Sequence, residues 1–208
     1  MNKPVVYGAD YSVYVRIVRL VLEEKGIDYE LVPVDVFAAD GIPRWYFDHH
    51  PFGSIPAFEH DGFRLHETSA IACYVDEAFD GPALQPVDTR LRATMNQIIG
   101  MLDAYAYRAM VWDVAVERLE KTTPDEALIA DGLLKARTTL QALSSLKAPG
   151  PWLMGSELTL ADLHAAPIIG YFIRVAEGRN LLAEFADVQA WWVRIAERPS
   201  FARTEKAG

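Results

Sequence analysis

Ser12 and the pair Glu67-Thr68 are residues whose types and positions could do chemistry. Each stands just before a stretch with helical periodicity, so each marks a predicted helix N-terminus. The free N–H groups and the positive dipole end of a helix suit an anion such as a carboxylate. The same residue types also act as plain helix caps, so capping stays open as the alternative.

The elements that would position these residues begin with a short strand, a helix and a second strand. Residues 4–7 form a brief apolar run, and residues 13–25 carry an apolar stripe at helical spacing. Gly26 is typical of the residue just past a helix end, with Ile27 as the apolar contact beyond it. Residues 28–36 alternate like a strand.

A loop-rich stretch, with a short helix predicted over residues 44–48, separates these elements from a hairpin. Asp61-Gly62 lies between two strand-like runs, which is a strong hairpin signal. Residues 67–78 then return to helical periodicity. The order is therefore β-α-β, a loop containing Pro56, and β-β-α.

The rest of the chain is patterned as helices. Residues 81–87 form a short proline-containing linker, and Thr159 with Asp162 predicts a capping-box variant at a helix start. The predicted helical stretches cover residues 88–119, 124–147, 159–176 and about 187–197.

Composition narrows the class of protein. The chain has 208 residues, a formal net charge of −9 and a single cysteine, Cys73. A nucleic-acid footprint is not expected, because the sequence has no run rich in Lys and Arg. No spanning helix, signal peptide, intramolecular disulfide or metal-ligand spacing is evident either, so we expect a cytoplasmic, reduced protein without a metal site or a membrane or nucleic-acid partner.

Four local motifs occur in a specific order. They are Val6-Tyr7-Gly8 with Ser12, Pro51-Phe52-Gly53-Ser54-Ile55-Pro56-Ala57, Glu67-Thr68-Ser69-Ala70-Ile71, and Leu158-Thr159-Leu160-Ala161-Asp162. Together they resemble the glutathione transferase family, nearest to its serine-type classes such as phi and theta and their bacterial relatives. The resemblance covers nearly the whole chain.

This resemblance implies an α+β thioredoxin-like N-terminal domain followed by an all-α helical domain. The glutathione-binding domain would cover residues 1–80, the linker residues 81–87 and the helical domain residues 88–208. It also implies glutathione as the co-substrate, with a small electrophile and a second copy of the chain in a homodimer as the partners. Phe52 matches an aromatic residue that some classes insert into the partner subunit, although it could equally stay in its own core.

The resemblance further implies how glutathione is held. The proline matching Pro56 is cis in the family, which would turn the backbone of Ile55 outward to pair with the cysteinyl portion, as in strand addition. Thr68 would donate to the γ-glutamyl carboxylate, and Glu67 would accept from the ammonium of the same group. The predicted glutathione-binding residues are Ser54, Ile55, Pro56, Glu67 and Thr68. For the glycine end, the cationic pair of the family falls near Gly41-Ile42, which cannot bind a carboxylate, so Arg44 is the predicted substitute, with Trp45 as its alternative.

Ser12 matches the catalytic serine of the family by position. A thiol has an ordinary pKa of about 8.5, and a hydroxyl donor at a helix N-terminus would lower it. Ser12 would then act as a hydrogen-bond donor to the thiolate. Tyr7 and Tyr11 remain rivals for this role, and Asp10 stands where these classes often carry proline or a small residue.

A wall for the second substrate is predicted between the two halves. Its candidate residues are Tyr11, Tyr105, Tyr107, Arg108, Val111 and Trp112. An aromatic stripe at helical spacing can equally belong to a core, whereas Arg108 could face an anionic electrophile. His49-His50 is predicted to be a solvated loop.

The function predicted from the sequence is that of a glutathione transferase, a detoxification enzyme that transfers an alkyl or aryl group to the glutathione sulfur. A glutathione-dependent isomerase, dehalogenase or ether-cleaving enzyme is the enzymatic alternative. A non-catalytic binding or regulatory module is the alternative of another class, since fold alone does not decide between them.

Overall fold

A computed structural model describes residues 2–205 of the chain. The chain divides into two compact units. Among the described residues, one unit comprises 2–83 together with 199–205, whereas the other comprises Leu84–Arg198. The proposed linker, residues 81–87, contains the point of division.

The first unit is built on a four-stranded mixed sheet with the strand order β2-β1-β3-β4. Strands β1 and β2 are parallel, while β3 is antiparallel to both β1 and β4. Its elements are β1 (Val5–Gly8), α1 (Val13–Lys25), β2 (Glu30–Pro33), the 3-10 helix η1 (Arg44–Asp48), β3 (Ala57–His60), β4 (Phe63–His66), α2 (Thr68–Ala78) and α9 (Pro199–Arg203). The predicted strand over residues 28–36 is shorter in the structure.

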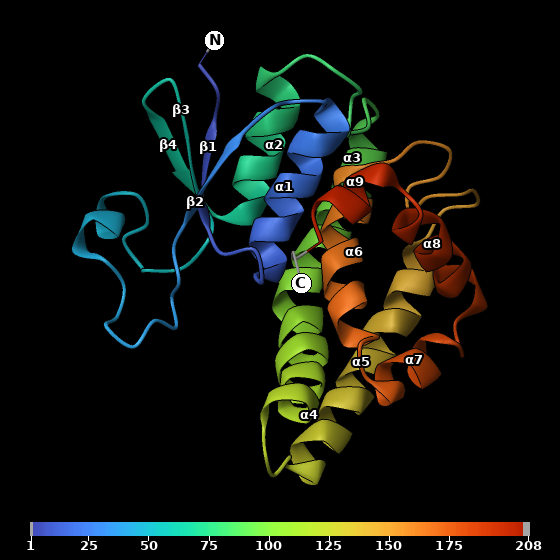
Figure 1. Cartoon of the computed structure of the whole chain (residues 1–208). Coiled ribbons are helices and arrows are strands. Elements are labelled where there is room, and N and C mark those ends of the chain that lie inside the picture. The colour runs from blue at the N-terminus through green and yellow to red at the C-terminus, as the bar shows by residue number, and fades with distance from the viewer. Residues whose placement is uncertain (1, 206–208) are drawn as a thin grey trace. The chain divides into compact units, whose positions relative to one another are not determined.

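Helices α1 and α2 cover one face of the sheet, and the segment that carries η1 lies on the other face (Figure 1). Val6 points into the helical layer and is buried, whereas its neighbour Tyr7 packs against His49 at a ring-centroid distance of 4.3 Å. This alternation is the period of two expected for a strand. The first unit therefore has an apolar helical side and an aromatic side.

The turn signals read from the sequence are confirmed. Gly26 adopts a left-handed φ of 71°, and the N–H of Ile27 donates to the carbonyl of Leu22, as in a Schellman motif. Asp61 and Gly62 have φ values of 50° and 81°, the backbone that a two-residue hairpin of type I′ requires.

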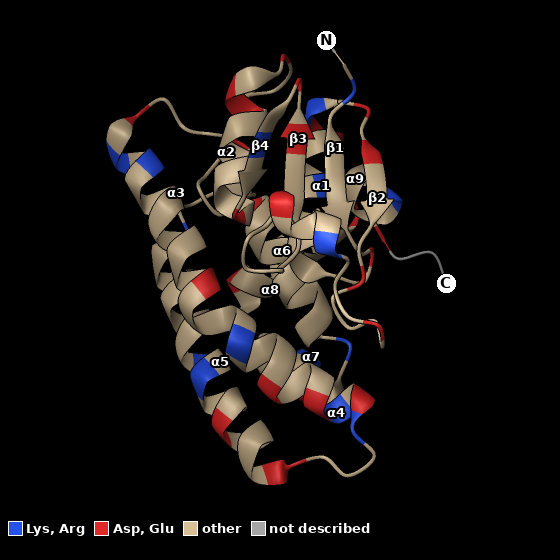
Figure 2. Ribbon diagram, turned by 90° about the vertical axis from the view of Figure 1, so that its left-hand side faces the viewer, with Lys and Arg blue, Asp and Glu red and all other residues tan. Residues whose placement is uncertain are grey.

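The second unit is all helical. Its elements are α3 (Thr89–Met101), the π-helical segment η2 (Leu102–Val116), α4 (Glu117–Glu120), α5 (Glu126–Leu146), α6 (Leu160–Phe172), α7 (Ala176–Leu182) and α8 (Ala186–Ala196). Helix α3, segment η2 and helix α4 follow one another without a break, as the long helical pattern predicted. Figure 2 shows acidic and basic residues interspersed along α5, as on a solvated helix face.

A buried carboxylate organises the second unit. Asp162 is fully buried, and its oxygens accept from the N–H groups of Leu153 and Thr159, the Thr159 hydroxyl and the indole N–H of Trp191 at 2.7–2.9 Å. The predicted capping box is therefore present at the start of α6. Burial raises the pKa of Asp162, and these donors act against the rise.

A buried ion pair joins α1 to α2. The ammonium of Lys25 lies 3.2 Å from Asp76 and also donates to the carbonyls of Asp76 and Pro82. Both side chains of the pair are almost wholly buried, so each depends on the other for compensation.

Replacing Asp76 by Ala should lower the free energy of unfolding by about 3 kcal/mol, because it leaves a buried ammonium without its counter-charge. Urea denaturation of both proteins would measure the loss. The exposed Asp80 serves as the control, and its replacement by Ala should change stability by less than about 0.5 kcal/mol. Equal effects of the two substitutions would contradict the assignment.

Candidate functional site

Three segments leave the sheet of the first unit at the same end. In the strand register, Ala57 is paired with Tyr7 on one side and with His66 on the other. The residues that follow β1, precede β3 and follow β4 must therefore begin close together. A Cβ on Gly8 would lie 3.4 Å from that of Ile55, which confirms the closeness of the first two.

Ser12 is the N-cap of α1. Its hydroxyl oxygen accepts from the N–H of Val15 at 3.3 Å, and its own N–H donates to the carbonyl of Ala9. Capping uses a lone pair of the hydroxyl and leaves its proton available to donate to an anion. Capping and anion binding are thus compatible roles for Ser12.

The hydroxyl of Tyr11 is already engaged. It donates to a carboxylate oxygen of Asp35 at 2.7 Å. Burial and this bond to Asp35 raise the pKa of Tyr11 far above its ordinary value, so the phenol stays protonated. In this arrangement the Tyr11 proton is directed to Asp35 and not to a thiolate.

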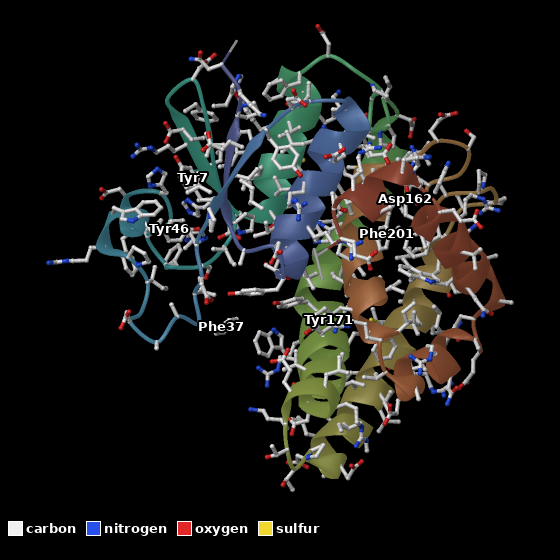
Figure 3. The ribbon with its side chains drawn as sticks, viewed as in Figure 1. Tyr7, Phe37, Tyr46, Asp162, Tyr171 and Phe201 are labelled. Carbon is white, nitrogen blue, oxygen red and sulfur yellow. The ribbon has the colours of Figure 1, made fainter. Side chains whose placement is uncertain are left out.

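Tyr7 lies on the aromatic face of the sheet. Its ring contacts His49 and Trp45, and Figure 3 places it on the sheet, on the side where Tyr46 also lies. Burial raises its pKa. These contacts give Tyr7 a packing role, which leaves Ser12 as the donor best placed at the start of α1.

The Ile55–Pro56 peptide bond is cis. Within the described residues, neither the N–H nor the C=O of Ile55 makes a hydrogen bond to the protein. A backbone donor and acceptor on one residue are the groups that strand addition requires from a protein edge. Ile55 can therefore pair with an extended peptide.

Tyr46 fixes the loop that carries Ile55. This tyrosine is fully buried, and its hydroxyl donates to the carbonyl of Ser54 at 2.6 Å. Burial raises its pKa well above the ordinary value, against the influence of the Ala57 amide. The donor is thus retained across physiological pH. The Ser54 side chain itself is exposed.

Glu67 and Thr68 stand at the start of α2 with their polar groups available. Within the described residues the Glu67 carboxylate, the Thr68 hydroxyl and the first N–H groups of α2 have no hydrogen-bonding partner. Glu67 has a positive φ of 72°, which is uncommon for a residue with a side chain and is often found at functional sites. This arrangement suits a zwitterion, whose carboxylate meets the helix and whose ammonium meets Glu67.

Comparisons with known proteins agree with this geometry. Residues 6–83 match the model of the glutathione S-transferase N-terminal domain, and residues 102–199 match that of the C-terminal domain. The chain belongs to the glutathione S-transferase family. Both the predicted family and the predicted enzyme class are thereby confirmed, as is the thioredoxin-like domain followed by a helical one.

The similar transferases include plant and bacterial proteins. The chain is 29% identical to glutathione S-transferase F13 of Arabidopsis thaliana over 204 residues, which covers 95% of this chain and 93% of the relative. The crystal structure of glutathione transferase F7 from Populus trichocarpa is 30% identical, with a TM-score of 0.85 and 97% coverage of both chains. A glutathione S-transferase from Methylobacillus flagellatus, solved with glutathione bound, shares the fold at 24% identity and a TM-score of 0.82, covering 99% of this chain and all of that one.

Arg44 is exposed at the first position of η1 in this transferase. Within the described residues it has no hydrogen bond or ion pair, so its guanidinium remains available to an anion. Nothing in the sequence pattern besides its charge marks it for the glycine end of glutathione.

The expectation that His49-His50 is a solvated loop is wrong. His50 is buried, and its ring lies 4.8 Å from that of His66. Burial, followed by the nearby His66, lowers the pKa of His50 and favours its neutral form. The error arose because the end of η1 folds back over the aromatic face of the sheet, a contact that no local pattern records.

The predicted second-substrate residues of the helical unit all lie in η2. Tyr105 is exposed, the indole of Trp112 bonds to Tyr107, and the Arg108 guanidinium lies 2.6 Å from the buried Asp113. Val111 is only 3% exposed and lies in the core of its unit, so a substrate could touch little of it. π-helical turns are rare and occur often at functional sites.

Two features of the site carry no signal in the sequence. Tyr46 is one aromatic residue among several in the predicted short helix over residues 44–48, and only its burial shows that its hydroxyl needs a partner. Asp35 was read as part of a strand, whereas it follows β2 and holds Tyr11. No group of three His, Cys, Asp or Glu side chains in residues 2–205 could hold a metal ion, and none of the described helices is long and apolar enough to cross a bilayer.

Replacing Tyr46 by Phe should weaken glutathione binding several-fold and lower stability by about 1–2 kcal/mol, because the Ser54 carbonyl loses its buried donor. Calorimetric titration and urea denaturation would measure the two effects. The exposed Tyr105 is the matched control, since its replacement by Phe removes a hydroxyl from the other unit. Unchanged affinity in the Tyr46 variant would show that the hydroxyl does not hold the Ile55 loop for binding.

Proposed function

We propose that this chain binds glutathione in its first unit and activates the thiolate for attack on a small, hydrophobic electrophile. The observation that carries the proposal is the strand register, which brings the segments that contain Ser12, Ile55 and Thr68 to one end of the sheet. Each of these three residues has a polar group available to a ligand. They would suit the thiolate, the cysteinyl backbone and the γ-glutamyl carboxylate of glutathione, respectively.

Each part of glutathione has a proposed partner. The N–H and C=O of Ile55, beside Pro56, pair with the cysteinyl backbone. The Thr68 hydroxyl and the start of α2 receive the γ-glutamyl carboxylate, and Glu67 accepts from its ammonium. Ser54 adds a hydroxyl next to this site, and Arg44 supplies a cation for the glycine carboxylate.

The reaction is the transfer of a carbon group to sulfur. The thiol first loses its proton to solvent. In a substitution, a sulfur lone pair forms the new C–S bond while the leaving group departs with the electron pair of its bond to carbon. In an addition, the electron pair displaced on the electrophile takes up a proton from solvent. The protein supplies position and stabilises the thiolate.

The proposed contacts of the second substrate are the candidate residues named from the sequence. Tyr11 precedes Ser12, the proposed hydrogen-bond donor to the thiolate. In η2 the proposed substrate contacts are Tyr105, Tyr107, Arg108, Val111 and Trp112. The Arg108 guanidinium is paired with Asp113, which reduces its attraction for an anionic electrophile. This pairing supports an electrophile of hydrophobic character.

A homodimer is proposed from Phe52. Its side chain is 77% exposed and contacts only the edges of His50 and His66 among the described rings. A large apolar side chain in that state is typical of an interface residue. Its insertion into a partner subunit would bury it.

Isothermal titration should detect glutathione binding, and Thr68→Val should weaken it by tenfold or more, because a hydrogen bond to a charged group contributes about 1.5–3 kcal/mol. Valine keeps the shape of the buried side chain. The control is Thr138→Val on α5, whose hydroxyl donates to the Leu134 carbonyl of its own helix. Absence of binding to the unmodified protein at millimolar glutathione would overturn the proposed function.

Ser12→Ala should leave the affinity for the protonated thiol form of glutathione nearly unchanged and raise the pKa of the bound thiol by about one to two units, through loss of one hydrogen bond to the thiolate. Ultraviolet absorbance of the thiolate against pH would show the midpoint moving upward. Asp125→Ala removes a cap of α5 and controls for loss of helix stability alone. If both variants leave the thiol pKa unchanged, Ser12 is not the thiolate donor.

A further inference from the structure

Two histidine rings contact each other on the aromatic face of the sheet, and the proposed binding of glutathione has given neither of them a role. His66 is the last residue of β4, and His50 follows the end of η1. Their ring centroids lie 4.8 Å apart at an interplanar angle of 44°. His50 is only 4% exposed, whereas His66 is half-buried.

The strand register explains why the two rings meet. Ala57 is paired with His66 on one side and with Tyr7 on the other. Residues directly opposite each other in antiparallel strands point to the same face of a sheet, so these three form a row across the aromatic face. His49 packs against Tyr7 in this row, and His50 packs against His66. The end of η1 is thus attached to the sheet through two ring pairs.

This attachment lies next to the loop that presents Ile55. The side chain of Ile55 packs against the buried cluster that contains Tyr46 and Ala57. The N–H of His50 donates to the Tyr46 carbonyl at 3.0 Å, and the N–H of Gly53 donates to the His50 carbonyl at 2.9 Å. A displacement of His50 would therefore be passed to the loop through its own backbone.

The position of His50 suits an uncharged imidazole. Its Nδ1 atom is buried and has no hydrogen-bonding partner in the part of the chain that the structure describes. An imidazolium carries an N–H on both ring nitrogens, whereas a neutral imidazole can leave one of them without a proton. Protonation would therefore bury a charged donor without an acceptor, and it would place a positive charge beside the ring of His66.

The charged groups around the pair do not remove this penalty. Burial, followed by the nearby His66, lowers the pKa of His50, while the Glu67 carboxylate and the backbone of His50 itself act against the shift. The carboxylate of Glu59 is already engaged, since it lies 3.4 Å from His49 and accepts from Arg64 at 2.7 Å. The titratable or charged side chains near the pair are Tyr46, His49, Glu59, Arg64 and Glu67.

The direction of the pH effect follows from this lowered pKa. Above the ordinary histidine pKa of about 6.5, His50 is neutral in both the folded and the unfolded chain, so it costs the fold nothing. As the pH falls below that value, the unfolded chain takes up the proton first, and the arrangement around His50 loses stability. Acid should therefore loosen the attachment, and neutral pH should preserve it.

We propose that His50, stacked on His66, is a positioning residue for glutathione, and that only its uncharged ring holds the Ile55 loop in place for binding. The proposal rests on the proposed function and adds a pH dependence to it. Protonation of His50 would loosen the loop and would attract the Glu67 carboxylate, which is the proposed acceptor for the γ-glutamyl ammonium. Glutathione binding would then weaken in acid without any change at Ser12.

The pH dependence is best measured with S-methylglutathione, because this probe has no thiol that could titrate. Calorimetric titration at pH 7.0 and 5.5 gives the two Kd values. An ordinary histidine is about 90% protonated at pH 5.5, so loss of the binding-competent form could raise Kd by at most about tenfold. Since the pKa of His50 is lowered, we expect a rise of about two- to fivefold. Equal Kd values at the two pH values would overturn the proposal.

His50→Gln removes the titrating group and keeps a polar side chain. Its Kd should change by less than about twofold between the two pH values, and any titration of the probe itself cancels in the comparison with the unmodified protein. His60→Gln is the matched control, because His60 is also a buried histidine of this sheet but faces Tyr74 of α2. The control should keep the pH dependence of the unmodified protein. The same dependence in His50→Gln would exclude His50 as its source.

His66→Phe tests the pair at a half-buried position, where a substitution is well tolerated. Phenylalanine keeps the ring contact and removes the neighbouring charge, so His50 should protonate more easily. The midpoint of the curve of Kd against pH should therefore move to higher pH, and an unchanged midpoint would contradict coupling between the two rings.

The same titrations separate this proposal from the proposed function. No binding of S-methylglutathione by the unmodified protein at pH 7.0 would defeat the proposed glutathione site itself. Binding at pH 7.0 that stays constant down to pH 5.5 would defeat only the role of His50.

Discussion

The double pairing of Ala57 is the constraint on which the candidate site depends. This residue sits opposite Tyr7 in β1 and opposite His66 in β4. A slip of one residue in either register would turn every side chain of the shifted strand to the other face. Each strand places alternate side chains on the aromatic face and on the apolar helical face. Packing on both faces would be lost by a slip, so both faces stabilise the register. The site is thus positioned by the whole core of the first unit.

The strand register does not fix the loop before β3, because the residues of that loop are not paired in the sheet. Its polar backbone must face outward at Ile55, and an exposed loop alone would sample many conformations. The buried hydroxyl of Tyr46 removes that freedom through its bond to Ser54. A hydrophobic residue at this position could pack equally well, but it could not hold a carbonyl. The tyrosine therefore links the packing of η1 to the preorganisation of a binding edge.

The sequence predicted what local patterns control. The helix stop at Gly26, the Asp61-Gly62 hairpin and the capping box at Asp162 depend on neighbours in the chain, and all three are present. What could not be predicted depends on residues distant in sequence. Asp35 meets Tyr11 across 24 positions and His50 meets His66 across two strands, so neither pairing leaves a periodic signal. The residues of the candidate site were found because motif and order, rather than contact, mark them.

Two acidic residues, Asp10 and Asp35, lie in the loops next to Tyr11 and Ser12. Their charge would disfavour a thiolate, so its size must be compared with that of the hydrogen-bond donors at the start of α1. A carboxylate about 10 Å away in water disfavours a second negative charge by only about 0.4 kcal/mol. A hydrogen bond to a charged acceptor contributes about 1.5–3 kcal/mol, and a helix N-terminus adds about 0.3–1 kcal/mol. Asp35 moreover directs its charge to Tyr11 and to the Phe37 amide. A thiolate bound as proposed would therefore gain more from the donors at the start of α1 than it would lose to a carboxylate at that distance.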